Sequence, residues 1–177
     1  DGKIRCLGLS NETPWGTMEF LRLAREHNLP RVVSMQNAYN LLNRSFENGM
    51  SEVCFREQIG AIPYSPLGFG HLSGKYVKDP AAPGRITQYP GFGQRYTKAN
   101  VEPAVRAYAA LAEKLSLSPA ALAQAFVNSR FFVTSTIIGA TSMAQLKENI
   151  AAFAIELPAD ALQEIEAIHL RYTNPAP

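Results

Sequence analysis

The residues best suited to chemistry in this 177-residue sequence are amides, hydroxyls and one aromatic ring, placed directly after short apolar runs. They are Ser10 and Asn11, Gln36 and Asn37, Tyr64 and Ser65, and Gly139 with Thr141. Such a set suits a planar polar ligand, for example a nicotinamide carboxamide with an aromatic ring stacked on it. The spacing alone leaves open that these are ordinary turn residues.

The residue arrangements that other kinds of chemistry require are not present in the sequence. The sequence shows no pair of carboxylates placed for general acid and base work, no His/Cys cluster at metal-ligand spacing and no Gly-x-Ser-x-Gly turn. His71 lies in a Gly-rich stretch better suited to wrapping a phosphate than to proton transfer. We therefore assign no catalytic residue and no metal ligand.

Four strand-then-helix units must position these residues. Apolar, β-branched runs predict strands at 4–9, 32–35, 60–64 and 133–138, and apolar periodicity predicts helices at 14–27, 45–58, 98–115, 119–129, 142–152 and 159–169. Strands that are apolar along their whole length, separated by helices, indicate a parallel sheet covered by helices. The fold class is α/β.

A barrel fits this pattern better than an open sheet. No Gly-x-Gly-x-x-Gly follows the first strand, and polar residues end every strand, as a shared face at the carboxyl ends of a barrel requires. Residues 1–177 form a single region, in which a Gly- and Pro-rich stretch at about 65–97 predicts a long loop.

Composition and charge exclude two classes of partner. A net charge of +2 with no basic run disfavours nucleic acid, and no apolar stretch is long enough to cross a membrane. No secretion signal is visible, so we expect a cytoplasmic protein with Cys6 and Cys54 reduced and buried. Because an apolar strand pattern begins by residue 4, we expect a piece of a longer chain.

Five motifs in a fixed order make the pattern specific. They are Gly8-Leu9-Ser10-Asn11-Glu12, Gln36-Asn37-Ala38-Tyr39-Asn40, Tyr64-Ser65-Pro66-Leu67-Gly68, Gly74-Lys75-Tyr76 and Ile138-Gly139-Ala140-Thr141. In their order and spacing the sequence resembles the aldo-keto reductases over nearly its whole length. Segments 40–47 and 172–177 resemble the branch that holds the Tas-type proteins and the potassium-channel β subunits.

This resemblance implies the C-terminal half, strands five to eight, of a (β/α)8 TIM barrel that holds NADP(H) across its carboxyl face. Ser10, Asn11 and Gln36 would hydrogen-bond the carboxamide, and Tyr64 would stack on the nicotinamide. The pyrophosphate cradle would comprise Ser65, Leu67, Gly68, Gly70, Lys75 and Arg85, where the two cations answer phosphate charge. The adenosine end would meet Gly139, Thr141, Gln145, Glu148 and Asn149 at a helix N-terminus.

The resemblance also sets the expected function. Many family members carry an Arg where Gln145 stands, to bind the 2′-phosphate, but Tas-type relatives use Gln, so NADP is favoured over NAD. The family's catalytic Asp, Tyr, Lys and His lie on four strands that precede this sequence. The complete protein would reduce aldehydes or ketones by hydride transfer from NADPH, and this chain alone would be inactive.

An alternative remains open, a non-catalytic nucleotide-binding half-barrel or a redox-sensing interaction module. The expected partners are a small carbonyl substrate in the complete enzyme, and either the missing amino-terminal half or a second copy of the chain, since a half-barrel leaves bare sheet edges.

Overall fold

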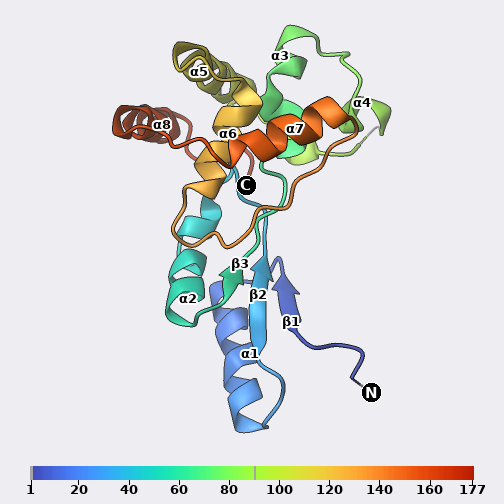
Figure 1. Ribbon diagram of the computed structural model, residues 1–177, viewed down its shortest axis with the longest axis vertical. Coiled ribbons are helices and arrows are strands. Elements are labelled where there is room, and N and C mark those ends of the chain that lie inside the picture. The colour runs from blue at the N-terminus through green and yellow to red at the C-terminus, as the bar shows by residue number, and fades with distance from the viewer. Residues whose placement is uncertain (1, 90) are drawn as a thin grey trace.

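Three parallel strands form the sheet of the computed structural model, which describes residues 2–89 and 91–177 (Figure 1). They are β1 (Leu7–Ser10), β2 (Val32–Gln36) and β3 (Gly60–Ala61), hydrogen-bonded in the order β1-β2-β3. Helices connect them, so the α/β class is confirmed. Asp1, and Pro90 in the predicted long loop, lie outside the described residues.

The first strand is shorter than predicted. It begins at Leu7 instead of Ile4, and residues 2–8 are exposed, because among the described residues β1 has a neighbour only on its β2 side. The prediction that Cys6 is buried was therefore wrong. Cys54 is buried as predicted, and burial raises the pKa of its thiol to about 11.

The fourth predicted strand, 133–138, does not form a regular strand in the described part of the chain. Val133 makes a single parallel bridge to Ala61, and the amide of Thr134 donates to the Ala61 carbonyl at 2.8 Å. The Ile137 amide donates to the Pro63 carbonyl at 2.9 Å. The run therefore lies along β3 as predicted, but β3 has only two residues and can offer only a short ladder.

Two helices lie beside this sheet. Helix α1 (Pro14–Glu26) begins as predicted, with the Thr13 hydroxyl accepting from the Gly16 amide at 3.1 Å. The predicted helix at 45–58 is split into a 3-10 turn, η1 (Ser45–Glu47), and α2 (Met50–Arg56). Gly49 interrupts it with φ +95°, a conformation that favours glycine.

The remaining helices form a second layer beyond the carboxyl ends of the strands (Figure 1). In the described part of the 65–97 loop the helical segments are short; they are η2 (Gly68–Ser73), α3 (Lys75–Lys78), α4 (Arg85–Gln88) and η3 (Gln94–Thr97). Longer helices follow, α5 (Val101–Lys114), α6 (Pro119–Asn128), α7 (Met143–Ala152) and α8 (Ala159–Arg171). No helix within 2–89 or 91–177 has the length and apolar character to cross a membrane.

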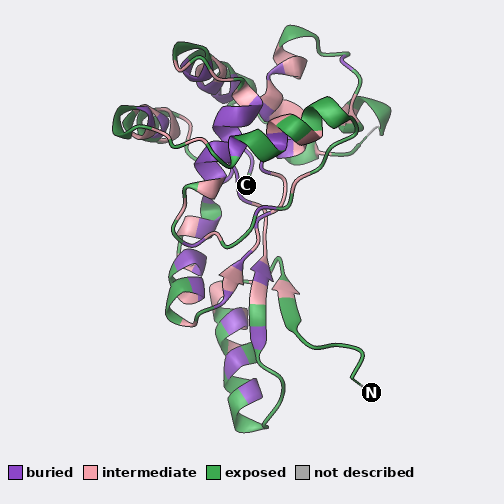
Figure 2. Ribbon diagram, in the orientation of Figure 1, coloured by how far each residue is buried: buried purple, intermediate pink, exposed green. Residues whose placement is uncertain are grey.

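Helix α6 is the centre of that layer. Every residue from 120 to 127 is buried, as Figure 2 shows, because α5, α7 and η2 all pack against it. Helix α8 packs in turn on α5. The Tyr39 ring, which follows β2, stacks on Phe126 with ring centroids 6.0 Å apart and so joins this layer to the sheet.

A buried cation holds the segment after β2 in place. The Arg44 side chain is 6% exposed and pairs with the carboxylates of Glu47 and Glu166, each at 2.8 Å. Its backbone amide donates to the Asn174 side chain at 2.6 Å, which pins the C-terminal tail. Burial acts to raise the pKa of Glu47, but hydrogen bonds from Arg44 and Tyr39 hold it below its usual value.

We predict that Arg44→Met lowers the free energy of unfolding by about 2–3 kcal/mol, less than for a fully enclosed pair because both carboxylates keep some contact with water. Arg106→Met, which removes an exposed helical pair with Glu102, should cost about 0.5 kcal/mol or less. Denaturant unfolding of both variants checks this, and equal losses would contradict it.

The loss of stability in Arg44→Met should depend on pH. Because the pKa of Glu47 is lowered in the folded protein, its pairing stabilises the fold above the unfolded value near 4.5 and is lost as pH falls through the folded value. The difference in free energy of unfolding between wild type and Arg44→Met should therefore become smaller below pH 4.5. A difference that stays constant on acidification would show that the ion pair contributes nothing.

Candidate functional site

The predicted nicotinamide residues lie together at the carboxyl ends of neighbouring strands. Asn11, held at φ +55°, donates its backbone amide to the Gln36 carbonyl at 2.9 Å. Its side-chain amide donates to the Ser10 hydroxyl at 3.1 Å, and its side-chain oxygen accepts from the Tyr64 hydroxyl at 2.8 Å. These contacts connect Ser10, Asn11, Gln36 and Tyr64 into one rim across three strands.

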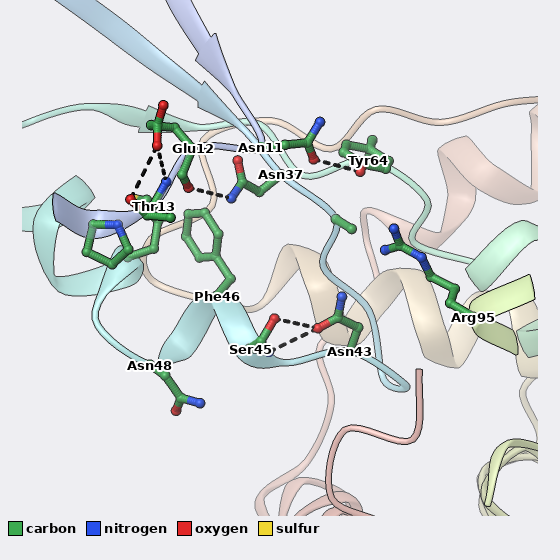
Figure 3. Close-up of a pocket in the computed structure, with 13 residues that line it drawn as sticks. Asn11, Glu12, Thr13, Asn37, Asn43, Ser45, Phe46, Asn48, Tyr64 and Arg95 are labelled. Carbon is green, nitrogen blue, oxygen red and sulfur yellow. Dashed lines mark hydrogen bonds between the residues drawn. The ribbon is translucent and has the colours of Figure 1, made fainter. Parts of the chain in front are cut away.

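A pocket of about 290 Å³ opens beside this rim (Figure 3). Of the predicted site residues, Asn11 and Tyr64 line it. The other polar residues of its lining have no ligand role predicted from the sequence; they are Glu12, Thr13, Asn37, Asn43, Ser45, Asn48 and Arg95. Asn37 is one of the strand-end residues named from the sequence, although without a ligand role, whereas the 43–48 segment carried no signal beyond family likeness.

Asn37 offers the pocket an unused hydrogen-bond acceptor. Its side-chain amide donates to the Glu12 carbonyl at 3.2 Å, while its side-chain oxygen is buried and has no partner among the described residues. Buried polar atoms are usually paired, so an unpaired acceptor at a pocket points to a donor on a bound molecule. An amide NH2 is such a donor.

The loop after Tyr64 has an unusual backbone. Ser65, Gly68, Phe69 and Gly70 all have positive φ, between +52° and +93°. Turns with left-handed residues can form a concave anion site from backbone N–H groups. In this turn the Gly68 and Gly70 amides donate to the Ser65 and Leu67 carbonyls, each at 2.9 Å, so an anion would rely on the remaining amides and on Lys75. The buried side chain of Asn40 holds the loop by donating to the Ser65 carbonyl at 2.9 Å.

Lys75 lies next to this loop and is not neutralised by an acid within the described chain. Its ammonium donates to the Pro83 carbonyl at 2.9 Å and lies 4.8 Å from the centre of the Tyr76 ring. A Cβ on Gly84 would come within 2.4 Å of that ammonium and 2.2 Å of the Tyr76 hydroxyl, so glycine leaves the room that the cation occupies. Two of the three N–H donors of Lys75 are then free for phosphate oxygens.

Two other residues of the 65–97 loop lie differently. Arg85 is exposed, and its guanidinium lies over the Phe92 ring at 5.7 Å, so the structure does not bring it to Lys75. His71 stacks on Tyr96 with centroids 5.1 Å apart, and burial lowers its pKa, which keeps it neutral at physiological pH.

The predicted adenosine residues gather at the start of α7. Gln145 accepts from the amide and the hydroxyl of Thr141 at 2.8 and 3.0 Å, and the Ser142 hydroxyl accepts from the Gln145 amide at 3.3 Å. The Ser142 hydroxyl thus caps α7, and the Gln145 side chain turns to Thr141. Thr141 and Gln145 are exposed.

Two of the predicted adenosine residues already form hydrogen bonds within the protein. Glu148 accepts from the Ser118 hydroxyl, which caps α6. Asn149 is 3% exposed, donates to the Gly139 carbonyl at 3.1 Å and accepts from Gln124 at 2.6 Å. Both side-chain atoms of Asn149 are therefore engaged, and its role in the structure is to hold the Gly139 turn against α6.

Within 2–89 and 91–177, no three His, Cys, Asp or Glu side chains lie close enough to hold a metal ion.

Comparison with known proteins identifies the family. The sequence profile of the "Aldo/keto reductase family" matches residues 1–170. The chain belongs to this family. It is 50% identical to "Protein tas" of Escherichia coli K12 over 99% of its length, in agreement with the predicted likeness, but covers only 51% of that protein.

Other family members match over a similar region. An "Aldo-keto reductase" of Babesia bovis is 38% identical over 98% of this chain and 64% of its own length. An "L-glyceraldehyde 3-phosphate reductase" of Escherichia coli K12 is 31% identical over 85% of this chain and 45% of its own length. The chain thus spans about half the length of most of the curated relatives named here.

The buried position of Asn149 generates a stability prediction. Asn149→Ala leaves the buried side chain of Gln124 without its acceptor partner, so we expect a loss of about 1–3 kcal/mol in the free energy of unfolding. Gln145→Ala, at an exposed position four residues earlier, should change it by about 0.5 kcal/mol or less. Thermal or denaturant unfolding measures both; equal effects would contradict the structural role given to Asn149.

Proposed function

We propose that this chain is the NADP(H)-binding half of a protein that reduces aldehydes or ketones by hydride transfer. The observation that carries the proposal is the rim of Ser10, Asn11, Gln36 and Tyr64, in a member of a family that typically uses NAD(P)H. The relatives' names, reductases of this family and of a triose phosphate, support a carbonyl substrate.

The residues present fit the cofactor's two polar parts. The unpaired Asn37 oxygen and the Asn11 and Ser10 side chains offer donors and acceptors to a carboxamide, and the Tyr64 ring offers a face for stacking. The turn that contains Ser65, Leu67, Gly68 and Gly70, next to Lys75, would bind the pyrophosphate. When bound, the nicotinamide supplies the hydride.

The choice of NADP rests on the other end of the site. Thr141 and Gln145 are exposed at the N-terminus of α7, where the helix dipole favours an anionic group such as a 2′-phosphate. Gly139, Glu148 and Asn149 would shape this end, with Asn149 acting through the Gly139 turn. Arg85 would have to leave the Phe92 ring to reach a phosphate.

We propose further that the catalytic Asp, Tyr, Lys and His belong to the other half of a (β/α)8 barrel, of which this chain supplies strands five to eight. The sheet order β1-β2-β3, continued by the run after Val133, supports this arrangement because four parallel segments lie in chain order. The residues of this chain would then bind and orient the cofactor, and those of the other half would transfer the proton.

The stacking role of Tyr64 is tested by NADPH titration of the full-length protein, followed by fluorescence. Tyr64→Ala should raise the dissociation constant about fivefold or more, since a stacked ring contributes roughly 1 kcal/mol beyond its buried area. Tyr64→Phe keeps the ring but loses the bond to Asn11, and should change it less. Unchanged affinity and turnover in Tyr64→Ala would refute the assignment.

The partner we propose is the missing half of the barrel or, without it, a second copy of this chain. Apolar side chains at and beside the sheet are exposed, among them Ile4, Leu7, Val33 and Ile137. The outer edge of β1 has no strand beside it in the described chain, and bare parallel edges next to apolar faces favour association.

Sedimentation of the isolated 19.4 kDa chain tests this proposal. We expect dimers or larger species at micromolar concentration, and a shift to a single heterodimer when the amino-terminal half of the full-length protein is added. On dilution, the self-associated species should dissociate before the heterodimer, because two copies of this chain bury less complementary surfaces against each other. A stable, folded monomer would contradict the half-barrel proposal.

A further inference from the structure

Arg95 is a positively charged residue in an otherwise mostly uncharged pocket. Of the pocket residues, only Arg95 and Glu12 are charged, and Figure 3 shows them at opposite sides. Glu12 accepts from the amide and hydroxyl of Thr13, which fixes it at the start of α1. Within the described chain, no carboxylate lies within ion-pair distance of Arg95. The guanidinium therefore faces the pocket without a counter-charge from the protein.

The backbone that carries Arg95 is firmly placed. The next residue, Tyr96, is 3% exposed, and its ring packs on Phe69 at 5.3 Å and stacks on His71 at 5.1 Å. The Tyr96 hydroxyl accepts from the buried Asn40 side chain at 3.4 Å. Although Arg95 itself is exposed, η3 is thus anchored to the loop that follows β2.

The rest of the lining suits hydroxyl groups. Asn37, Asn43, Asn48 and Ser45 present amide and hydroxyl groups, and apolar surface comes mainly from Phe46 and Met50. A short, hydroxylated chain would satisfy these groups better than a long apolar one, which would leave them unpaired.

We infer that Arg95 is a specificity-determining residue that binds a carboxylate or phosphate group of a short, hydroxylated carbonyl substrate. A guanidinium matches both anions by donating two parallel hydrogen bonds. This inference deepens the proposed function and rests on it, because the substrate's carbonyl group is taken from that proposal. The binding of an anionic group by Arg95 is argued from the pocket alone.

The test compares matched substrates in the full-length protein with NADPH. Glyceraldehyde 3-phosphate is paired with glyceraldehyde, and succinic semialdehyde with butanal, so that each pair differs by one anionic group. In the wild type, kcat/KM should favour the anionic member of at least one pair, and the two pairs distinguish phosphate from carboxylate. Arg95→Gln should reduce that anionic-to-neutral ratio about tenfold or more, the loss expected for a charge-assisted hydrogen bond.

Two variants act as controls. Arg95→Lys keeps the charge but not the paired donors, and should restore part of the ratio. Arg106→Gln removes the same charge from the exposed face of α5, outside the pocket, and should leave the ratio unchanged. A ratio that falls equally in Arg106→Gln would show a general effect of net charge and overturn the inference.

A binding measurement separates this inference from the proposed function. Glycerol 3-phosphate, succinate and glycerol are titrated calorimetrically into the protein with NADP⁺ in excess, so that the cofactor's phosphate cradle is filled. If no carbonyl is reduced but glycerol 3-phosphate or succinate binds and Arg95→Gln abolishes it, the proposed function fails and the anion site stands. If the wild type binds and reduces neutral and anionic partners equally, the inference is overturned. It is overturned as well if Arg95→Gln weakens only NADPH binding, because Arg95 would then serve the cofactor.

Discussion

The buried guanidinium of Arg44 is the contact on which the geometry of the pocket depends. Asn43, Ser45 and Phe46 flank it and line the pocket, so their positions follow from where Arg44 is held. Arg44 is bound to η1 through Glu47, to α8 through Glu166 and to the C-terminal tail through Asn174. An element distant in sequence, α8, thereby fixes a wall of the candidate site without contributing a side chain to its lining.

Asn40 connects the parts of the site that bind different groups. Its side-chain oxygen accepts from the amides of Leu42 and Asn43, which shapes the pocket loop. Its side-chain amide donates to the Ser65 carbonyl and to the Tyr96 hydroxyl. One fully buried amide therefore joins the loop after β2, the proposed pyrophosphate turn and η3, which carries Arg95. Because each bond uses a different atom or lone pair, a change at Asn40 would disturb all three together.

The sequence predicts elements with strong local signals and fails where long-range contacts decide. Thr13-Pro14 and Ser118-Pro119 correctly mark helix starts, since a cap and a proline act within one turn. The strand-end positions of Asn11 and Tyr64 were also predictable, because each stands at the end of an apolar run. The pocket residues Asn43, Asn48 and Arg95 were not, because their placement depends on Arg44 and Tyr96, whose partners lie up to 130 residues away. Cys6 was misplaced since an apolar run indicates burial only where a neighbouring strand covers it.

In the described chain, the contacts that place the candidate ligand-binding groups are separate from the burial of apolar surface. The bonds that place Asn11, Tyr64, Lys75 and the η3 turn all run between residues of this chain. Exposed apolar side chains, by contrast, are spread over β1, β2 and four helices, α1, α2, α7 and α8. Local hydrogen bonds thus preorganise the proposed ligand contacts independently of how much apolar surface the described residues leave exposed.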